Sequence, residues 1–148
     1  MRIVIQRVTR ASVTVEGEII GKIGKGFLIF LGVSESDNEQ IAERFAEKIS
    51  KLRIFDDENG KTNLSIKDVD GEALVVSQFT LYADCKKGNR PSFTNAGSPE
   101  KAEKLYEYFI SLMESKDINT AHGSFGADMK VDILNDGPFT VILDSDLM

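Results

Sequence analysis

The sequence predicts a single α/β domain in which two helices pack on one large and strongly curved sheet. Its 148 residues suit one domain, and no repeat, linker or low-complexity segment divides residues 1–148. Segments with the two-residue periodicity of strands precede, separate and follow two segments with helical periodicity. Because several strands follow one another through short turns, a wholly parallel Rossmann sheet is disfavoured.

Four strands are expected before the first helix. Residues 2–9 alternate apolar and polar side chains, as a strand with one buried face does. Residues 11–16 and 18–23 flank the pair Glu16-Gly17, which is typical of a hairpin turn. Residues 26–33 are apolar on both faces, so this strand is predicted to be central and covered on both sides.

The periodicity changes at Asp37, where apolar residues begin to recur at helical spacing. Asp37 and Gln40 have the arrangement of a capping box, which predicts the start of the helix. A strand is expected at 51–55, followed by a turn at 57–60. Residues 73–82 are predicted to form a second strongly apolar strand.

A second helix is predicted after a polar loop at 83–98. Ser98 suits its N-cap and Pro99 its first helical position. Residues 118–143 are then expected to form short strands interrupted by glycines, of which Gly137 is the last.

The net charge is −6, which by itself disfavours a nucleic-acid partner. The acidity is local, however, because residues 1–90 hold 14 basic and 14 acidic side chains, whereas residues 91–148 hold 4 basic and 10 acidic ones. Lys86, Lys87 and Arg90 form a short basic stretch without an acidic neighbour between them. A polyanionic partner is therefore disfavoured but not excluded.

Cysteine and histidine usage excludes several kinds of chemistry. Cys85 is the only cysteine, so no intrachain disulfide can form, and His122 has no partner residues at zinc-ligand spacing. Neither a metal nor another cofactor is expected. The opening residues lack the apolar core of a signal peptide, and the longest apolar run, Phe27–Leu31, is too short to cross a bilayer. These features predict a cytoplasmic protein without membrane contact.

Three segments carry side chains that suggest a binding or catalytic site. The stretch SQFT at 77–80 places polar groups at the end of an apolar strand, where burial without partners is costly. Gln78 there could contact a base edge and Thr80 a developing oxyanion, although ordinary cross-strand pairs are an alternative. The other segments are NDGPFT at 135–140 and GSFGADM at 123–129, for which a turn and a bulged strand end are the alternatives.

Together these segments closely resemble the D-aminoacyl-tRNA deacylase (D-tyrosyl-tRNA deacylase) family, homodimeric proofreading enzymes that hydrolyse D-amino acids from tRNA. The resemblance extends over essentially the whole chain, from the opening MRIVIQRVTRASVTVEG to Thr140. Its specificity lies in Ser-Gln-x-Thr at 77–80 and Asn-x-Gly-Pro-x-Thr at 135–140, with Gly-x-Phe-Gly-Ala-x-Met between them.

The resemblance implies a layered β/α/β, barrel-like fold and a pocket at a dimer interface. Gly137 and Pro138 would enter this pocket from the partner subunit through a cis peptide bond and would exclude an L-side chain. Achiral glycine would not be excluded, so glycyl-tRNA is an expected second substrate. The catalytic wall would consist of Ser77, Gln78, Phe79 and Thr80, and the substrate pocket would include Phe125, Met129, Asn135 and Thr140.

The resemblance leaves two routes for hydrolysis. Thr80 would be the nucleophile in the first, but a threonine hydroxyl needs an activating neighbour that the sequence does not offer. In the second, which we favour, the 2′-hydroxyl of the terminal adenosine assists and Thr80 positions the substrate. Phe79 would then donate its backbone N–H to the oxyanion, and Gln78 would contact the adenosine.

The implied partners are the acceptor end of aminoacyl-tRNA and a second copy of the chain, but no DNA. Lys86, Lys87 and Arg90 are expected to make weak tRNA contacts, with a solvated loop as the alternative. Two other functions remain open at this point. One is a non-catalytic RNA-binding or scaffold protein, and the other is a small ester hydrolase that uses Cys85 and His122.

Overall fold

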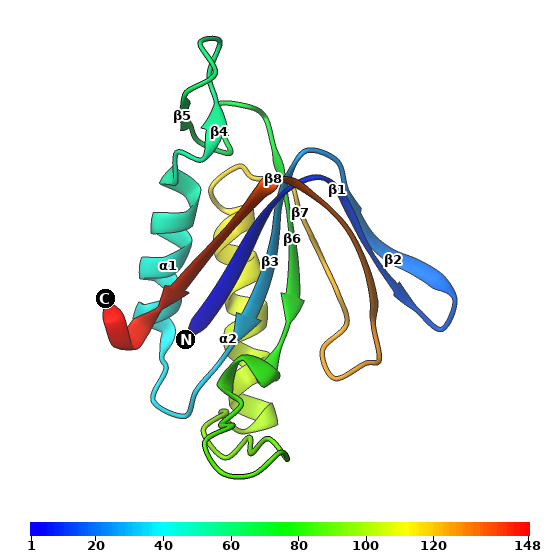
Figure 1. The fold of residues 1–148 in the computed structure, drawn as a ribbon, viewed down its shortest axis with the longest axis vertical. Helices are drawn as coiled ribbons and strands as arrows, with labels where there is room; N and C mark the ends of the chain where they lie inside the picture. Colours follow the sequence, from blue (N-terminus) through cyan, green and yellow to red (C-terminus); the bar gives the residue numbers. More distant parts are fainter.

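The computed structural model describes residues 1–148 and confirms the α/β domain with a curved sheet and two helices (Figure 1). Six strands form one mixed sheet in the order β2-β1-β3-β6-β7, with β8 pairing β1 as well. Their bounds are β1 (Arg2–Val15), β2 (Glu18–Ile23), β3 (Gly26–Gly32), β6 (Glu72–Ser77), β7 (Thr120–His122) and β8 (Lys130–Asp144). The strand β3 runs parallel to β6, and β6 parallel to β7.

The long strand β1 determines the curvature of the sheet. Its partner β8 pairs with it from Arg2 to Thr14, whereas β3 pairs only up to Val8 and β2 only from Ala11 onward. Since a strand has two edges, β2 and β3 must share one edge of β1 in succession. The sheet therefore curls towards a barrel, and the two strands predicted at 2–9 and 11–16 are one continuous strand (Figure 1).

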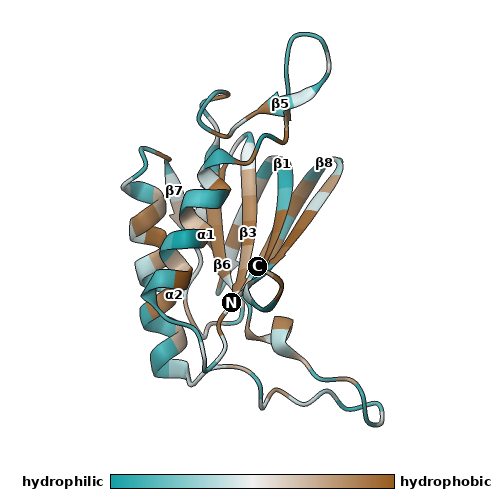
Figure 2. Ribbon diagram, turned by 90° about the vertical axis from the view of Figure 1, so that its left-hand side faces the viewer, coloured by the Kyte–Doolittle hydropathy of each residue, from teal (hydrophilic) through white to brown (hydrophobic).

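The helices α1 (Glu39–Lys51) and α2 (Pro99–Glu114) cover one face of the sheet (Figure 2). The predicted N-cap Ser98 is confirmed, because its hydroxyl accepts a hydrogen bond from the N–H of Lys101. The prediction that Asp37 caps α1 is wrong. Asn38 is the cap, since its side chain accepts a hydrogen bond from the N–H of Ile41. None of the helices is long and apolar enough to span a membrane.

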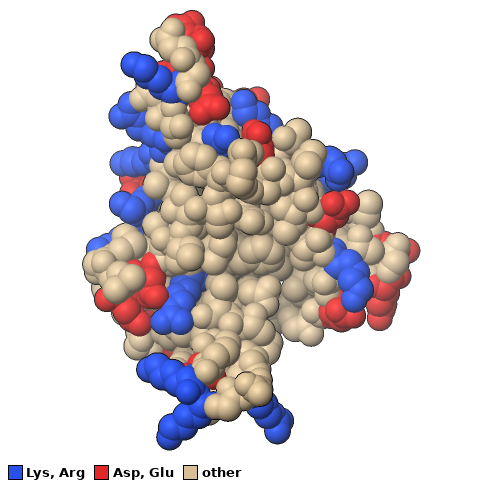
Figure 3. All heavy atoms as spheres, in the orientation of Figure 1, with Lys and Arg blue, Asp and Glu red and all other residues tan.

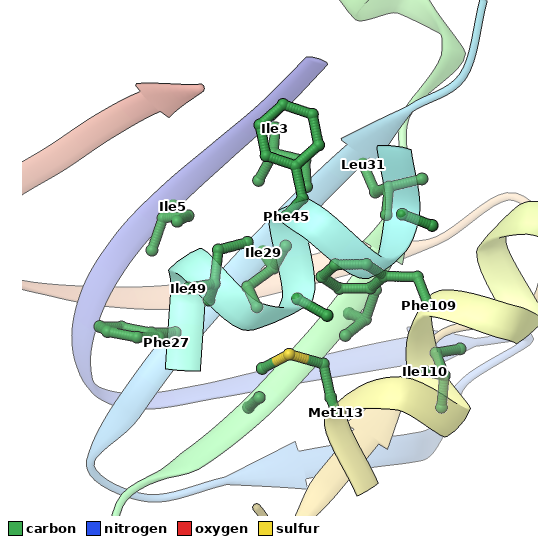
Figure 4. Packing of buried hydrophobic residues seen from close by; sticks show 14 of the residues in the cluster. Ile3, Ile5, Phe27, Ile29, Leu31, Phe45, Ile49, Phe109, Ile110 and Met113 are labelled. Atoms are coloured by element: carbon green, nitrogen blue, oxygen red, sulfur yellow. The ribbon is translucent and has the colours of Figure 1, made fainter. Parts of the chain in front are cut away.

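Two apolar clusters hold the layers together. The larger lies between the sheet and the helices, where Ile3, Ile29 and Leu31 meet Phe45 and Phe109 (Figure 4). The smaller lies within the curl of the sheet and contains Val8, Ala11, Val13, Ile23, Leu28, Leu74 and Val76. Odd-numbered residues at the start of β1 thus face the helices, and Val4 between them faces the other way.

Two of the predicted strands, 51–55 and 73–82, differ from the observed ones. Residue 51 still belongs to α1, and only Phe55–Asp56 form β4, which pairs with β5 (Thr62–Leu64) in a projecting hairpin. The predicted strand 73–82 ends at Ser77, because its neighbour β3 ends at Gly32, and the chain then turns into the 3-10 helix η1 (Phe79–Tyr82). A second short 3-10 helix, η2 (Ser145–Leu147), ends the chain.

The C-terminal region contains fewer strands than predicted, since Gly137 does not separate two of them. Pairing with β1 continues on both sides of this glycine, so β8 bends there and remains one strand. The register shifts at Val8 of β1 accommodate the bend.

Candidate functional site

The SQFT stretch at 77–80 forms the turn between the sheet and η1. The N–H of Gln78 donates to the carbonyl of Leu31 at 2.8 Å, which fixes the turn to the end of β3. Phe79 is the first residue of η1, and the first N–H groups of a helix have no acceptor within it. The Thr80 hydroxyl is exposed and accepts a hydrogen bond from the side-chain amide of Gln78. The N–H of Phe79 thus has no acceptor within η1, and the Thr80 hydroxyl beside it is exposed.

A mainly apolar cavity of about 590 Å³ opens beside this turn. Ser77, Gln78 and Phe79 form one wall, and Phe125 and Met129 from the loop before β8 form another. The third wall contains Phe93, Ala96 and Gly97 of the loop before α2. Five of the predicted site residues therefore meet in one cavity, whose volume falls in the range typical of small-molecule sites.

The other predicted signature lies in the bend of β8. The peptide bond between Gly137 and Pro138 is cis, as the resemblance implied. Gly137 has a φ of +142°, and a Cβ added there would lie 2.9 Å from the backbone nitrogen of Phe139, so this position requires glycine. The Asn135 side chain closes the bend by donating to the carbonyls of Arg7 and Phe139 and accepting from the N–H of Phe139.

A buried arginine that the sequence analysis did not single out holds this bend. Arg7, which is 7% exposed, donates through Nε to the carbonyl of Asp136 at 2.9 Å and through a terminal nitrogen to the carbonyl of Ile54 at 2.8 Å. Its guanidinium also lies 4.8 Å from the centre of the Phe139 ring. Arg7 therefore fixes the position of the bend against the base of the β4–β5 hairpin.

The two signatures lie at opposite ends of the sheet within one chain (Figure 1). Arg2 donates to the carbonyl of Leu81 in η1 at 3.0 Å, while Arg7 donates to Asp136 in the bend. These arginines are five positions apart on β1, which corresponds to about 17 Å between their Cα atoms. Accordingly, neither Gly137 nor Pro138 lines the cavity, and Asn135, Thr140 and Thr80 are not among its lining residues.

Comparison with known proteins shows the family to which the chain belongs. The sequence model of the family described as D-Tyr-tRNA(Tyr) deacylase matches residues 4–144. The D-aminoacyl-tRNA deacylase of Lactobacillus gasseri is 56% identical over 144 residues, covering 97% of this chain and 99% of that one. The chain belongs to the D-Tyr-tRNA(Tyr) deacylase family.

Other members of the deacylase family show similar agreement. The D-aminoacyl-tRNA deacylase of Koribacter versatilis is 57% identical and covers 98% of this chain and 97% of that one. Among solved structures, a protein titled c-Myc DNA Unwinding Element Binding Protein superposes with a TM-score of 0.92 at 45% identity, covering 98% of this chain and 99% of its own. A probable eukaryotic D-amino acid tRNA deacylase shares the fold alone, with a TM-score of 0.80 at 17% identity and coverage of 96% and 97%.

The predicted basic stretch lies on the loop before α2, the same loop that forms one wall of the cavity. Lys86, Lys87 and Arg90 are exposed near the tip of that loop, where basic side chains gather at the lower end of the molecule (Figure 3). Two backbone hydrogen bonds between Asp84 and Ser92 close the tip, at 2.7 and 2.9 Å. The loop thus carries positive charge at its tip and a cavity wall at its base.

The residues of the alternative hydrolase are not brought together. Cys85 is exposed on the basic loop, whereas His122 lines a second cavity with acidic residues of α2 and points Nδ1 at the carbonyl of Gly123. No hydrogen bond joins Cys85 to His122, and no group of three or more metal-ligating side chains is present. The expected absence of a cofactor stays a prediction.

Tyr82 is the last residue of η1 and does not line the cavity. Burial raises the pKa of Tyr82 to about 12, and its hydroxyl lies next to Ser34 without a hydrogen bond of normal geometry. The Arg2 guanidinium stacks on its ring at 4.6 Å from the centre. Tyr82 therefore acts as an apolar support for the turn that carries Gln78 and Thr80.

Sequence analysis missed the third wall of the cavity. Phe93 lies in a polar loop with no periodicity, so no strand or helix pattern marks it. The signal that could have identified it is an aromatic side chain close to a basic stretch, which is a frequent feature of nucleic-acid sites.

Proposed function

We propose that this protein is a D-aminoacyl-tRNA deacylase, which hydrolyses the ester bond between a D-amino acid and the terminal adenosine of tRNA in the cytoplasm. The products are the free D-amino acid and the tRNA. The observation that carries the proposal is the 590 Å³ cavity, one wall of which is the Ser77–Phe79 part of the family signature. The names of close relatives support the same activity.

The exposed turn suggests how the ester is attacked. In our proposal, the N–H of Phe79 donates to the oxygen of the tetrahedral intermediate, because it has no acceptor in η1. Thr80 is hydrogen-bonded to the amide of Gln78, which is not a base, so its hydroxyl positions the substrate rather than attacking it. Water is the nucleophile: with the assistance of the 2′-hydroxyl of the terminal adenosine it adds to the ester carbonyl, and the adenosine 3′-oxygen then leaves and takes up the proton that the water loses.

This mechanism is tested with a tRNA whose terminal adenosine lacks the 2′-hydroxyl and carries the amino acid on the 3′ position. We expect hydrolysis of that substrate to be strongly slowed, while Thr80→Ala retains measurable turnover. Trapping of an acyl-threonine intermediate, or an unchanged rate on the deoxy substrate, would exclude the RNA-assisted route.

Selection against L-amino acids requires a second copy of the chain in our proposal. In one chain, the arginines that contact η1 and the bend lie about 17 Å apart along β1, and neither Gly137 nor Pro138 lines the cavity. We propose that the bend of a partner covers the cavity and that its backbone carbonyls exclude an L-side chain. A D-side chain points away, and glycyl-tRNA is accepted because it has no side chain.

An uncovered apolar row on the sheet supports this homodimer. Phe30, Val4 and Ile142 lie directly opposite one another on β3, β1 and β8, and they face away from the helices. Ile142 is 70% exposed, which is unusual for an isoleucine within a sheet. The same face shows a broad area without charged side chains, surrounded by charges (Figure 3).

The acceptor end of the tRNA would approach from the basic loop. Lys86, Lys87 and Arg90 extend from the element that forms one cavity wall, so they can contact phosphates next to the bound terminal nucleotide. Three such contacts predict weak binding of tRNA, with an affinity that decreases as the salt concentration rises.

The activity is tested by comparing D-tyrosyl-tRNA and L-tyrosyl-tRNA as substrates, with Cys85→Ala as the control variant. We expect release of D-tyrosine only, at the same rate for the wild type and Cys85→Ala. A non-catalytic RNA-binding protein would release neither amino acid. Loss of turnover in Cys85→Ala would support the cysteine hydrolase instead.

The shared site is tested by mixing two variants, neither of which forms an intact site in its own dimer. One carries Gln78→Ala and Thr80→Ala, and the other carries Gly137→Ala, whose Cβ meets the backbone of Phe139. If each site combines groups from two chains, a mixed dimer contains one site with neither change. Equal mixing then restores about one quarter of the wild-type sites, whereas sites within single chains would give none. Full activity and selectivity of Gly137→Ala alone would overturn the proposed filter.

A further inference from the structure

Two phenylalanine rings lie exposed against each other in the cavity. Phe79 is 54% exposed and Phe93 is 37% exposed, and their ring centres are 5.0 Å apart with an edge-to-face angle of 68°. Both rings line the 590 Å³ cavity, and neither belongs to either apolar cluster of the core. The fold therefore does not need Phe93 for its core, and its exposed ring surface is available to a ligand.

The loop on which Phe93 lies is fixed at both sides of the ring. The paired backbone hydrogen bonds between Asp84 and Ser92 end immediately before it. After it, the N–H of Gly97 donates to the carbonyl of Val33 at 2.8 Å, and the N–H of Ser98 donates to the carboxylate of Glu35 at 3.0 Å. The ring is thus held in place before any ligand binds, which lowers the entropic cost of stacking on it.

Positive charge and an aromatic ring lie on the same loop. Arg90 is three residues before Phe93, and the two lysines precede Arg90. Proteins that hold the end of a single nucleic-acid strand combine cations for the phosphates with aromatic rings for the bases. A nucleotide is the one kind of ligand that needs both, since an amino acid has no phosphate.

We propose that Phe93 stacks on the terminal adenine base of the tRNA and that the Phe79 ring, which is inclined to Phe93 by 68°, contacts the same base with its edge. This inference rests on the proposed deacylase function and names a binding residue for it. The terminal adenine is a flat aromatic group that every aminoacyl-tRNA substrate carries next to the ester bond, whereas the amino-acid side chain changes. A fixed aromatic surface therefore suits the base better than the side chain.

The test measures kcat and KM of Phe93→Ala, Phe93→Tyr and the control Ile19→Ala on two substrates, D-tyrosyl-tRNA and D-alanyl-tRNA. Ile19 is also an exposed apolar residue, at 61%, but it lies on β2 outside the cavity. We expect Phe93→Ala to raise KM by about 5- to 150-fold on both substrates with little change in kcat, as the loss of one stacked base predicts. Phe93→Tyr and Ile19→Ala should behave like the wild type.

Two kinetic results would overturn the inference. If Phe93→Ala raised KM for D-tyrosyl-tRNA but not for D-alanyl-tRNA, the amino-acid side chain, and not the base, would contact Phe93. An equal fall in kcat for Phe93→Ala and Phe93→Tyr with unchanged KM would assign Phe93 a role in the structure of the catalytic turn.

A binding measurement separates this inference from the proposed function. Adenosine 5′-monophosphate is added to the wild-type protein while the ring resonances of Phe93 and Phe79 are followed by NMR. Shifts of both rings that are absent with inorganic phosphate support base stacking, even if the protein fails to hydrolyse D-tyrosyl-tRNA. Hydrolysis without any shift of the Phe93 ring would leave the deacylase proposal intact and exclude Phe93 from base binding.

Discussion

Replacing Ile142 by aspartate is expected to separate the proposed homodimer into monomers without unfolding the chain. In the single chain this side chain is already 70% exposed, so a polar residue there removes little of the core. Its neighbours across the sheet, Val4 and Phe30, keep their own packing. The change therefore acts on the association of two copies and not on the fold of one.

The magnitude follows from the apolar surface that the partner would cover. Complete burial of an isoleucine stabilises by about 1.5–3 kcal/mol, and the exposed 70% accounts for about 1–2 kcal/mol of this. A twofold interface contains the residue twice, which gives about 2–4 kcal/mol in total. The dissociation constant should rise by about 30- to 1,000-fold, and more if the two carboxylates are desolvated.

The assay combines analytical ultracentrifugation with turnover of D-tyrosyl-tRNA over a range of protein concentrations. Activity per chain should fall in parallel with the fraction of dimer, while the melting temperature extrapolated to low concentration stays unchanged. Ile19→Asp serves as the control, because this exposed residue pairs with Thr14 and not with the Val4 end of β1. A fully active monomer, or an Ile142→Asp protein that remains dimeric, would refute the reasoning.

Three other substitutions test separate parts of the structure. Arg7→Met keeps an apolar stem beside Phe139 but removes the hydrogen bonds to two carbonyls. The free energy of unfolding, measured by urea denaturation, should therefore fall by about 2–4 kcal/mol. A change near zero would mean that other groups fix the bend. Burial raises the pKa of Tyr82 to about 12, whereas the pKa of a tyrosine in the unfolded chain is about 10. The stability that the neutral Tyr82 hydroxyl contributes is therefore complete below pH 10 and is lost as the pH rises through 12. Tyr82→Phe should therefore flatten the fall in melting temperature between pH 10 and 12, and an unchanged slope would contradict the assigned cause. Replacing Lys86, Lys87 and Arg90 by alanine should reduce the slope of log KM against log salt by about 2, and an unaffected slope would place the phosphate contacts elsewhere.

The helices were predictable because their signals are local. The spacing of apolar residues in α2 and the Ser98-Pro99 start lie within one segment of sequence, and the structure agrees with both. The N-cap of α1 was predicted one position too early, because a contact with a residue distant in sequence decides it. The Asp37 carboxylate pairs with the buried ammonium group of Met1 and accepts from the N–H of Ser34, so it is not available as a cap.

The strands were harder to predict because their ends depend on their neighbours. The stretch FTLY at 79–82 is apolar enough to continue β6, yet β3 beside it has already ended at Gly32. Similarly, the exposed residues Thr9 and Arg10 interrupt the alternation in β1, although pairing with β8 and β2 continues the strand beyond them. Pairing partners distant in sequence decide both cases, and no local pattern contains them.

The site was predicted in its parts but not in its arrangement. The signatures at 77–80 and 135–140 were recognisable from residue order, whereas Phe93 and Arg7 become visible only when the loop and the strand are in place. The 17 Å between the signatures follows from the register of β1, to which each is attached through an arginine.

This separation also constrains how two copies can combine. Val4 lies between Arg2 and Arg7 on β1, and with Phe30 and Ile142 it forms the uncovered apolar row. A twofold axis that lies between the two copies, parallel to the sheets and perpendicular to β1 above Val4, would exchange the two ends of the strand. The bend at Gly137 in one copy, about 10 Å from Val4, would then lie over the partner's Arg2 end, about 7 Å from the axis on the side of η1. One contact surface in the middle of β1 would thereby complete both cavities at once.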